Sequence, residues 1–360
     1  MSRIASLDRG EVEAVLDEVD FAGVVHIVGE DGEAPLTIAR GLADRAFGIA
    51  NTPATRFACA SVSKLVTAMT VARLVGAGKL EFGARYADLV GAKWRPAELD
   101  PTVTLRHLLG HTSGFGDYFD EEGHEPYEAI WTRIPPNTVR GPKDFWPLLR
   151  DLPQVALPGK RAVYNNGAFV LVGIALEEVT GLGFPELVRR EVFGPLGMVD
   201  SGFWALDEVV PRLATGYLPP DPEGSARAVE ASWRTNVYAV PAIGGPDGGV
   251  QSTARDLVRL LDGLTGRGEG APLLSQETRA ELVGPHVTSD DNDGDFRYGL
   301  GVLHVGEGPS TRFGHTGEDP GASARAWTYP ATGERLIVVS NVTEAAGPVT
   351  RRIDALLAGD

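Results

Sequence analysis

The sequence predicts an α+β fold, in which both ends of the chain build one antiparallel sheet flanked by helices and a mainly helical domain is inserted between them. Residues 22–30 and 34–40 have strand patterns around Asp31-Gly32, which is typical of a β-hairpin. Strand patterns return after residue 296, whereas between about 80 and 285 the apolar residues recur at helical spacing. One sheet built from both termini is the simplest arrangement for this order of elements.

Each element follows from a local pattern. Asp8 can cap a first helix whose apolar face contains Val12, Leu16 and Val19. Helical spacing predicts further helices at 61–77, 104–110, 143–151, 168–181, 184–193, 253–264, 275–283 and 346–358, and strand patterns predict strands at 298–305, 310–316, 325–329 and 335–340. The long connections 115–142 and 205–248 are candidates for functional loops.

These elements predict a division into two domains. Residues 1–79 and 286–360 form the sheet domain, and residues 80–285 form the mainly helical domain. We expect the active site at the interface between them.

Composition excludes several classes of protein. The chain has 360 residues, of which 43% are hydrophobic, enough for a sizeable core. The net charge of −16 disfavours nucleic acid as a partner. No stretch approaches the roughly 18 apolar residues of a membrane span, so we expect no membrane partner.

The N-terminus and the cysteine content predict a cytoplasmic protein. The first residues lack a basic segment followed by an apolar run, which a signal peptide requires. The single cysteine, Cys59, agrees with a reducing compartment, and we expect it to be a small core residue.

Three short motifs carry the chemistry. They are Ser61-Val62-Ser63-Lys64, Tyr164-Asn165-Asn166 and His315-Thr316-Gly317, and each pattern occurs once. A Ser-x-x-Lys sequence alone is a weak signal. The three motifs together, in this order, predict a serine nucleophile with groups that move its proton.

The spacing of the first motif places Ser61 and Lys64 on one face of a helix start. A serine hydroxyl needs a base within hydrogen-bond reach. Lys64 can be that base only if its pKa is depressed; otherwise its charge favours ionisation of a second group, and Tyr164 is the natural one. We therefore predict Ser61, Lys64 and Tyr164 as catalytic residues.

The remaining site residues are predicted to bind the substrate. Asn166 can bind a substrate amide and hold Lys64. The strand that contains His315, Thr316 and Gly317, expected at the sheet edge over 311–317, can pair with an extended substrate. The N–H groups of Glu318 and Ser61 are candidates for an oxyanion hole.

The chain resembles the serine acyl-transferring family that holds class C β-lactamases, D-alanyl-D-alanine carboxypeptidases, D-aminopeptidases and related esterases. The resemblance extends from about residue 20 to 355 and includes TLRHLLGHTSG (104–114), VFGPLGM (192–198), GGVQSTARDLVRLL (248–261), YGLG (298–301) and GHTGEDPG (314–321). It implies a β-lactamase/transpeptidase-like fold, with Ser61 acylated, Lys64 and Tyr164 handling protons, and Asn166 and His315–Gly317 orienting the substrate.

Two departures from the family pattern bear on the substrate. His315 stands where β-lactamases of this family usually have lysine, and Glu318 stands where a small residue is common. A carboxylate at that position would disfavour anionic substrates. The histidine at position 315, together with the absence of an export signal, leads us to expect a serine hydrolase acting on a small ester or amide. The alternatives are a D-alanyl peptidase, a β-lactamase, or a biosynthetic acyltransferase on the same scaffold.

Other classes of function are also considered. A non-catalytic binding module on this scaffold would usually have lost one of the three motifs. His107 and His111 have the spacing of a metal pair, but the sequence offers no third ligand cluster beside them. We expect no metal and no organic cofactor, with a small-molecule substrate as the partner. The sequence does not set the oligomeric state.

Overall fold

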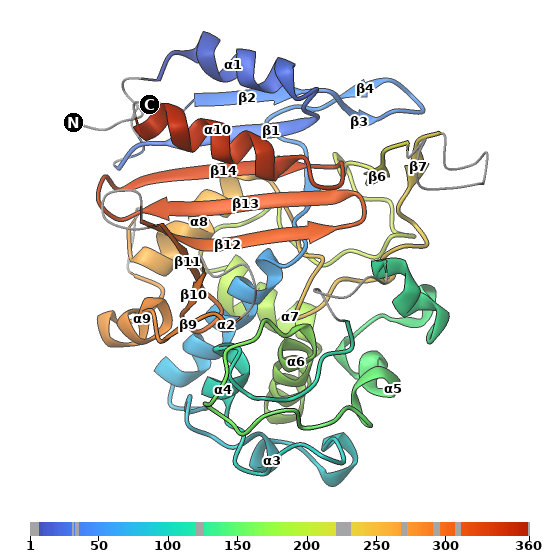
Figure 1. The fold of residues 1–360 in the computed structure, drawn as a ribbon, viewed down its shortest axis with the longest axis vertical. Helices are drawn as coiled ribbons and strands as arrows, with labels where there is room; N and C mark the ends of the chain where they lie inside the picture. Colours follow the sequence, from blue (N-terminus) through green and yellow to red (C-terminus); the bar gives the residue numbers. More distant parts are fainter. Residues whose placement is uncertain are drawn as a thin grey trace.

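A computed structural model describes residues 7–30, 32, 36–119, 126–220, 232–267, 272–290, 296–306 and 311–358. The fold is α+β, as the sequence predicts, and a large antiparallel sheet is flanked by helices (Figure 1). Strands from both ends of the chain meet in this sheet, because β1 (Gly23–Val28) pairs with β14 (Glu334–Ser340).

Among the described residues, the main sheet contains eight strands in the order β2-β1-β14-β13-β12-β11-β10-β9. The further members are β2 (Leu36–Arg40), β9 (Val287–Thr288), β10 (Arg297–Tyr298), β11 (Leu303–Val305), β12 (Arg312–Asp319) and β13 (Ala322–Tyr329). Small two-stranded sheets pair β3 (Leu42–Asp44) with β4 (Ile49–Ala50), β5 (Phe57–Ala58) with β8 (Gln251–Ser252), and β6 (Tyr217–Leu218) with β7 (Arg234–Thr235).

Helices cover both faces of the sheet, since its central strands have buried apolar side chains on both sides. Along β14, Leu336 and Val338 contact one core cluster, whereas Ile337 and Val339 contact the other. Helices α1 (Arg9–Glu18) and α10 (Ala346–Ala358) lie on the first face and α8 (Ala254–Thr265) on the second (Figure 1). The division into a sheet domain (1–79 and 286–360) and a helical domain (80–285) stays a prediction. Helix α8 belongs to the segment 80–285 but packs on the sheet.

The other helices lie mainly beyond the β12 side of the sheet (Figure 1). They are α2 (Val62–Gly76), α3 (Tyr86–Leu89), α4 (Leu105–Leu109), α5 (Trp146–Leu149), α6 (Asn166–Thr180), α7 (Phe184–Val188) and α9 (Gln276–Val283). The short turns are η2 (Ala92–Trp94), η3 (Tyr127–Thr132), η4 (Pro136–Thr138), η5 (Pro142–Phe145) and the π-type η6 (Arg189–Phe193). Almost every residue of α2 and the first eleven of α6 are buried, so these two helices form the centre of the larger core.

Most local predictions are confirmed. The Asp8 side chain caps α1 at the N–H of Gly10, and Glu11 completes the capping box. Strands β1 and β2 form the predicted hairpin, although most of its turn lies outside the described residues. Ser61 is the N-cap residue of α2.

Three predictions are wrong in detail. The strand expected over 298–305 is two short strands, β10 and β11, because a turn with Gly301 at φ 69° separates them. The helix expected over 143–151 is divided between η5 and α5. Strand β12, which contains the third motif, is an edge strand only in part. Strand β11 pairs with residues 312–314 of β12, and this pairing ends before His315.

Within the described ranges, no single helix is long and apolar enough to span a membrane, and one bent pair, Asn166–Thr180 with Phe184–Phe193, has the required length and composition together.

A pair of matched leucine substitutions tests the core assignment. Leu261 on α8 is completely buried, whereas Leu206 is 39% exposed. We expect Leu261→Ala to lower the free energy of unfolding by about 2–5 kcal/mol, because it removes buried methyl groups and leaves a cavity. Leu206→Ala should change it by about 0.5 kcal/mol or less. Urea denaturation of both variants measures the difference, and equal effects would contradict the assignment.

Candidate active site

Ser61 lies at the junction of a strand and a helix. Strand β5 pairs with β8, and the chain then turns into α2 through Ala60, whose φ of 46° is in the left-handed region. The turn is closed by the N–H of Val62, which donates to the carbonyl of Cys59 at 3.1 Å. The turn leaves Ser61 half-buried at the N-terminal end of the helix, where backbone N–H groups favour negative charge.

Lys64 is completely buried beside Ser61. Its Nζ donates to the Ser61 hydroxyl at 2.9 Å, to Asn166 Oδ1 at 2.7 Å and to the carbonyl of Asp247 at 2.7 Å. Asn166 thus holds Lys64, as the sequence analysis expects. An ammonium group has three donors, and these three acceptors match them.

The glycine-rich loop around Asp247 is bound to the first turns of α2. Thr67 Oγ1 donates to the carbonyl of Pro246 at 2.7 Å, and the N–H of Val250 donates to Ser63 Oγ at 2.8 Å. These bonds place the Asp247 carbonyl over Lys64.

The second motif opens α6. Asn165 is the N-cap residue, and its Oδ1 accepts from the N–H of Ala168 at 2.6 Å. The Asp117 carboxylate accepts from the N–H groups of Asn166 at 2.6 Å and Gly167 at 2.9 Å. Asp117 thereby fixes the backbone of the residue that holds Lys64, and a carboxylate at this end of a helix is electrostatically favourable.

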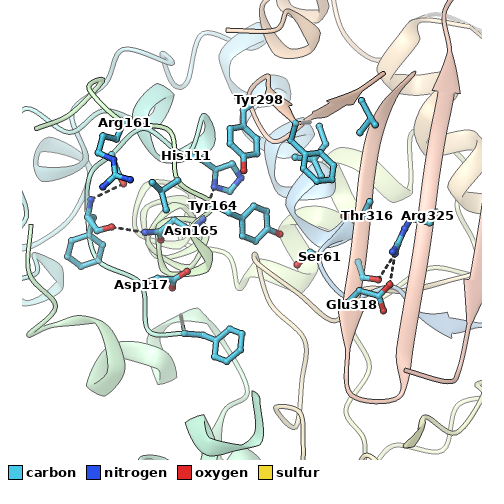
Figure 2. Close-up of a pocket in the computed structure, with 18 of the residues that line it drawn as sticks. Ser61, His111, Asp117, Arg161, Tyr164, Asn165, Tyr298, Thr316, Glu318 and Arg325 are labelled. Atoms are coloured by element: carbon cyan, nitrogen blue, oxygen red, sulfur yellow. Dashed lines mark hydrogen bonds and ion pairs between the residues drawn. The ribbon is translucent and has the colours of Figure 1, made fainter. Parts of the chain in front are cut away.

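Tyr164 is half-buried and lies next to the lysine. The Lys64 ammonium is 4.7 Å from the centre of the Tyr164 ring, and Figure 2 shows the hydroxyl end of the ring directed toward Ser61. His111 stacks on the same ring, with centroids 4.6 Å apart and planes at 21°. The His315 ring lies 6.5 Å from it on a tilted plane.

Gly317 allows β12 to approach the nucleophile. A Cβ at this position would lie 2.2 Å from the Cys59 carbonyl oxygen and 3.0 Å from the Ser61 nitrogen. Any other residue would therefore displace β12 from the turn that precedes Ser61.

His315 is completely buried and neutral at neutral pH. Its Nδ1 lies 2.5 Å from the carbonyl oxygen of Thr316, which makes Nδ1 the protonated nitrogen. Burial, and after it the Lys64 charge, lower the pKa of His315 to about 3. The next residue, Thr316, points to the opposite face of β12, is half-buried, and lines a cleft beside Ser61.

The Glu318 side chain is held by neighbours on the sheet side. Its Oε1 forms an ion pair with Arg325 at 2.6 Å and accepts from Ser323 Oγ at 2.8 Å, as Figure 2 shows for Arg325. Arg325 therefore offsets the Glu318 charge, and the repulsion of anionic substrates expected from this carboxylate is reduced.

A buried acidic pair lies behind the lysine. Tyr118 donates to Asp247 Oδ2 at 2.5 Å, and both side chains are buried. Burial raises the pKa of the Asp247 carboxyl, and the Lys64 charge opposes this rise. Burial, followed by the Asp247 charge, raises the pKa of Tyr118 well above its usual value.

Two hollows meet at Ser61. The larger cleft, of about 1030 Å³, contains Tyr164 and Thr316 and is lined on its apolar parts by Phe115, Val155, Val163, Phe296, Leu303 and Trp327. The smaller hollow, of about 360 Å³, is lined by Asn166 and by the acidic residues Glu128, Asp247, Glu318, Asp319 and Glu344. A substrate bound at Ser61 can thus extend in two directions.

Comparison with known proteins identifies the family. Residues 9–359 match the family model described as Beta-lactamase. The chain belongs to the beta-lactamase family. It is 32% identical over 285 residues to esterase EstB of Burkholderia gladioli, which covers 72% of this chain and 71% of EstB. Relatives of this kind are hydrolases, and the protein is a serine hydrolase.

Solved structures agree with this membership. A penicillin-binding protein from Bacillus halodurans superposes with a TM-score of 0.86 and 35% identity, covering 96% of this beta-lactamase family member and 99% of that chain. The D-amino acid amidase of Ochrobactrum anthropi SV3 superposes with a TM-score of 0.79 over 98% of both chains, but at 23% identity it supports the fold alone.

The structure brings all eight predicted site residues together in this family member. Ser61, Lys64 and Asn166 are joined by hydrogen bonds, and Tyr164 lies against the lysine. His315, Thr316, Gly317 and Glu318 follow one another along β12 beside Ser61. Sequence reasoning missed Asp117, which accepts from the Asn166 N–H, and Asp247, whose carbonyl accepts from Lys64. Their only sequence signal is position, since Asp117 follows the HTSG turn and Asp247 lies in a glycine-rich segment.

The two histidines with metal-like spacing have other contacts. His107 Nδ1 accepts from the N–H of Thr104, at the start of α4. His111 Nδ1 accepts from the N–H of Asn165 at 3.0 Å. In the part of the chain that the structure describes, no group of three or more potential metal-ligating side chains occurs. Cys59 is buried, its Sγ donates to the Phe57 carbonyl, and burial raises its pKa to about 12.

Gly317→Ala tests the close approach of β12. We expect hydrolysis of p-nitrophenyl esters to fall about 10²-fold, because the new Cβ forces β12 away from Ser61. The control is Gly83→Ala, whose Cβ would meet no atom within 4 Å. If Gly317→Ala kept the activity of Gly83→Ala, the close approach would not be required.

The buried histidine predicts a pH dependence of stability. The unfolded chain binds a proton at His315 below its usual pKa of 6.5, whereas the folded protein does so only near 3. The free energy of unfolding should therefore fall as pH decreases from 6.5 toward 3, by up to about 1.4 kcal/mol per pH unit for this histidine.

The control for this effect is His315→Gln, which removes the titrating group. Denaturation midpoints of both proteins between pH 7 and 4 measure the difference in slope. Parallel curves would show that His315 does not remain neutral in the folded state.

Proposed function

We propose that this serine hydrolase forms an acyl-enzyme on Ser61 and acts on a small ester or amide. The observation that carries the proposal is the contact of the buried Lys64 ammonium with the Ser61 hydroxyl at 2.9 Å. Ser61 Oγ accepts this hydrogen bond, so its own proton is available to another acceptor.

In this proposal Lys64 remains charged. Its three donors meet three acceptors, an arrangement that favours the ammonium form. The charge in turn favours the phenolate of Tyr164, whose ring centre is 4.7 Å away. Tyr164 is therefore the proposed general base, and Lys64 the group that sustains it.

The proposed reaction has two steps. Ser61 Oγ attacks the carbonyl carbon while its proton moves to the Tyr164 oxygen. The tetrahedral intermediate then expels the alcohol or amine, which takes the proton from Tyr164. Water attacks the acyl-Ser61 ester in the second step, loses its proton to Tyr164, and releases the acid as the proton returns to Ser61.

Backbone groups are proposed to stabilise the negative oxygen of the intermediate. The turn between β12 and β13 has two residues, so Asp319 and Ala322 form the hydrogen-bonded pair that closes the hairpin. Hydrogen-bonded and non-hydrogen-bonded pairs alternate along an antiparallel ladder, so the N–H of Glu318 is directed away from β13. Gly317, the residue before Glu318, lies against the Cys59–Ser61 turn, since a Cβ on Gly317 would be 3.0 Å from the Ser61 nitrogen, and this close approach supports a role for both N–H groups. Two converging N–H groups can form an oxyanion hole.

The preference for an ester or amide rests on the charges around Ser61. A neutral His315 gives no positive charge for a substrate carboxylate at this position. Apolar side chains in the larger cleft suit an uncharged acyl group. Four arginines also line the cleft, of which Arg312 and Arg325 are paired with Asp354 and Glu318. The 32% identity to an esterase supports the same choice.

A D-alanyl peptidase or a β-lactamase is the second candidate. It is favoured by the 35% identity to a penicillin-binding protein across nearly the whole chain. An acyltransferase would use the same first step with an amine or alcohol in place of water. The cytoplasmic location stays a prediction from the sequence.

Ser61→Ala tests the proposed nucleophile. We expect the wild-type protein to be labelled by a fluorophosphonate and to hydrolyse p-nitrophenyl esters, and the variant to lose both properties. Ser275→Ala, which removes a hydroxyl that caps α9, should keep both. Full esterase activity in Ser61→Ala would overturn the proposal.

Intact-protein mass after incubation with benzylpenicillin separates the substrate classes. A persistent adduct that is absent in Ser61→Ala would favour a D-alanyl peptidase. Consumption of the drug without an adduct would favour a β-lactamase. An unmodified protein with intact drug is the result expected for the ester or amide hydrolase.

A further inference from the structure

His111 contacts Tyr164 and both of its chain neighbours, through its backbone carbonyl and its ring. The His111 carbonyl accepts from the N–H of Val163 at 3.0 Å, and Nδ1 accepts from the N–H of Asn165 at 3.0 Å. The imidazole itself stacks on the Tyr164 ring at 4.6 Å. One residue therefore fixes the chain on both sides of Tyr164 and one face of its ring, as Figure 2 shows for the two rings.

His111 is itself held in place by the core. It is 3% exposed, and its ring also packs on Phe169 at 5.2 Å and Tyr298 at 4.8 Å. Its φ of 57° is in the left-handed region, which non-glycine residues seldom adopt. Such a conformation persists only where the surrounding structure requires it.

Nδ1 of the His111 ring accepts a hydrogen bond from the backbone. Because the Asn165 N–H donates to Nδ1, the proton of the neutral imidazole lies on Nε2. Burial, and then the Lys64 charge, lower the pKa of His111 well below its usual value. A second proton would have to be placed on Nδ1, against the Asn165 N–H. The imidazole thus remains neutral and does not accept the serine proton.

We propose that His111 is the positioning residue of Tyr164, and that it sets the angle and depth of the phenol between Lys64 and Ser61. The proposal rests on the proposed function, in which Tyr164 moves the serine proton. Stacking at 21° fixes the plane of the ring, and the two backbone bonds fix its Cα.

Two variants separate the contributions of the ring and the acceptor. His111→Asn retains an acceptor at the position of Nδ1 and tolerates a positive φ, but it removes the stacked ring. His111→Phe retains a ring and removes the acceptor, which leaves the Asn165 N–H without a partner. We expect each to lower kcat for p-nitrophenyl esters by about 10- to 100-fold with KM unchanged, because only the geometry of proton transfer is altered.

The control is His26→Asn, since His26 is on β1, its ring bonds Thr37 Oγ1 on β2, and it lines neither hollow. It should keep the wild-type kcat. Circular dichroism and the melting temperature of each variant show that the proteins compared are folded.

A double-mutant cycle with Tyr164→Phe distinguishes positioning from a general structural effect. If His111 acts through Tyr164, adding His111→Asn to Tyr164→Phe should cause no further loss of kcat. Losses that multiply in the double variant would overturn the inference, as would wild-type kcat in both folded His111 variants. Retention of activity by Ser61→Ala would instead overturn the proposed function, so the two failures are distinguishable.

Discussion

The site depends on the burial of one positive charge. An ammonium group without water is unfavourable unless every donor finds an acceptor. Lys64 finds its three acceptors on three separate segments, which are the start of α2, the start of α6 and the glycine-rich loop around Asp247. These segments have to converge at one point for the folded state to be stable. The nucleophile, the tyrosine and the substrate hollows are consequently placed around the same nitrogen atom.

Backbone geometry also positions the segments of the site. Ala60 adopts a left-handed conformation to start α2 abruptly after β5, and Gly317 lets β12 come into direct contact with that turn. On the opposite side, Asp117 binds the first N–H groups of α6. The helices thus supply the reactive side chains, while the sheet supplies a rigid wall of backbone. Neither part makes a complete site without the other.

Local sequence signals were sufficient for the fold and for the first motif. Ser61 and Lys64 are one helical turn apart, so their contact follows from spacing alone. The roles of Asn166 and the β12 residues were predicted from the co-occurrence of the three motifs and from the family resemblance, because no local rule places these residues near Ser61. Asp117, Asp247 and the stacking of His111 on Tyr164 depend on contacts between distant segments, which periodicity cannot reveal. The direction of the Glu318 side chain likewise depends on Arg325 from the neighbouring strand.

The pairing of β1 with β14 has a consequence for the order of assembly during synthesis. These strands come from nearly opposite ends of the chain, and β12 and β13 join the sheet beside β14. A nascent chain that has already emerged with Ser61, Lys64 and Tyr164 still lacks the wall formed by Gly317 and Glu318. Contacts of such long sequence separation also form slowly. The wall beside Ser61 can therefore be completed only after the segment that forms β12, β13 and β14 has been synthesised.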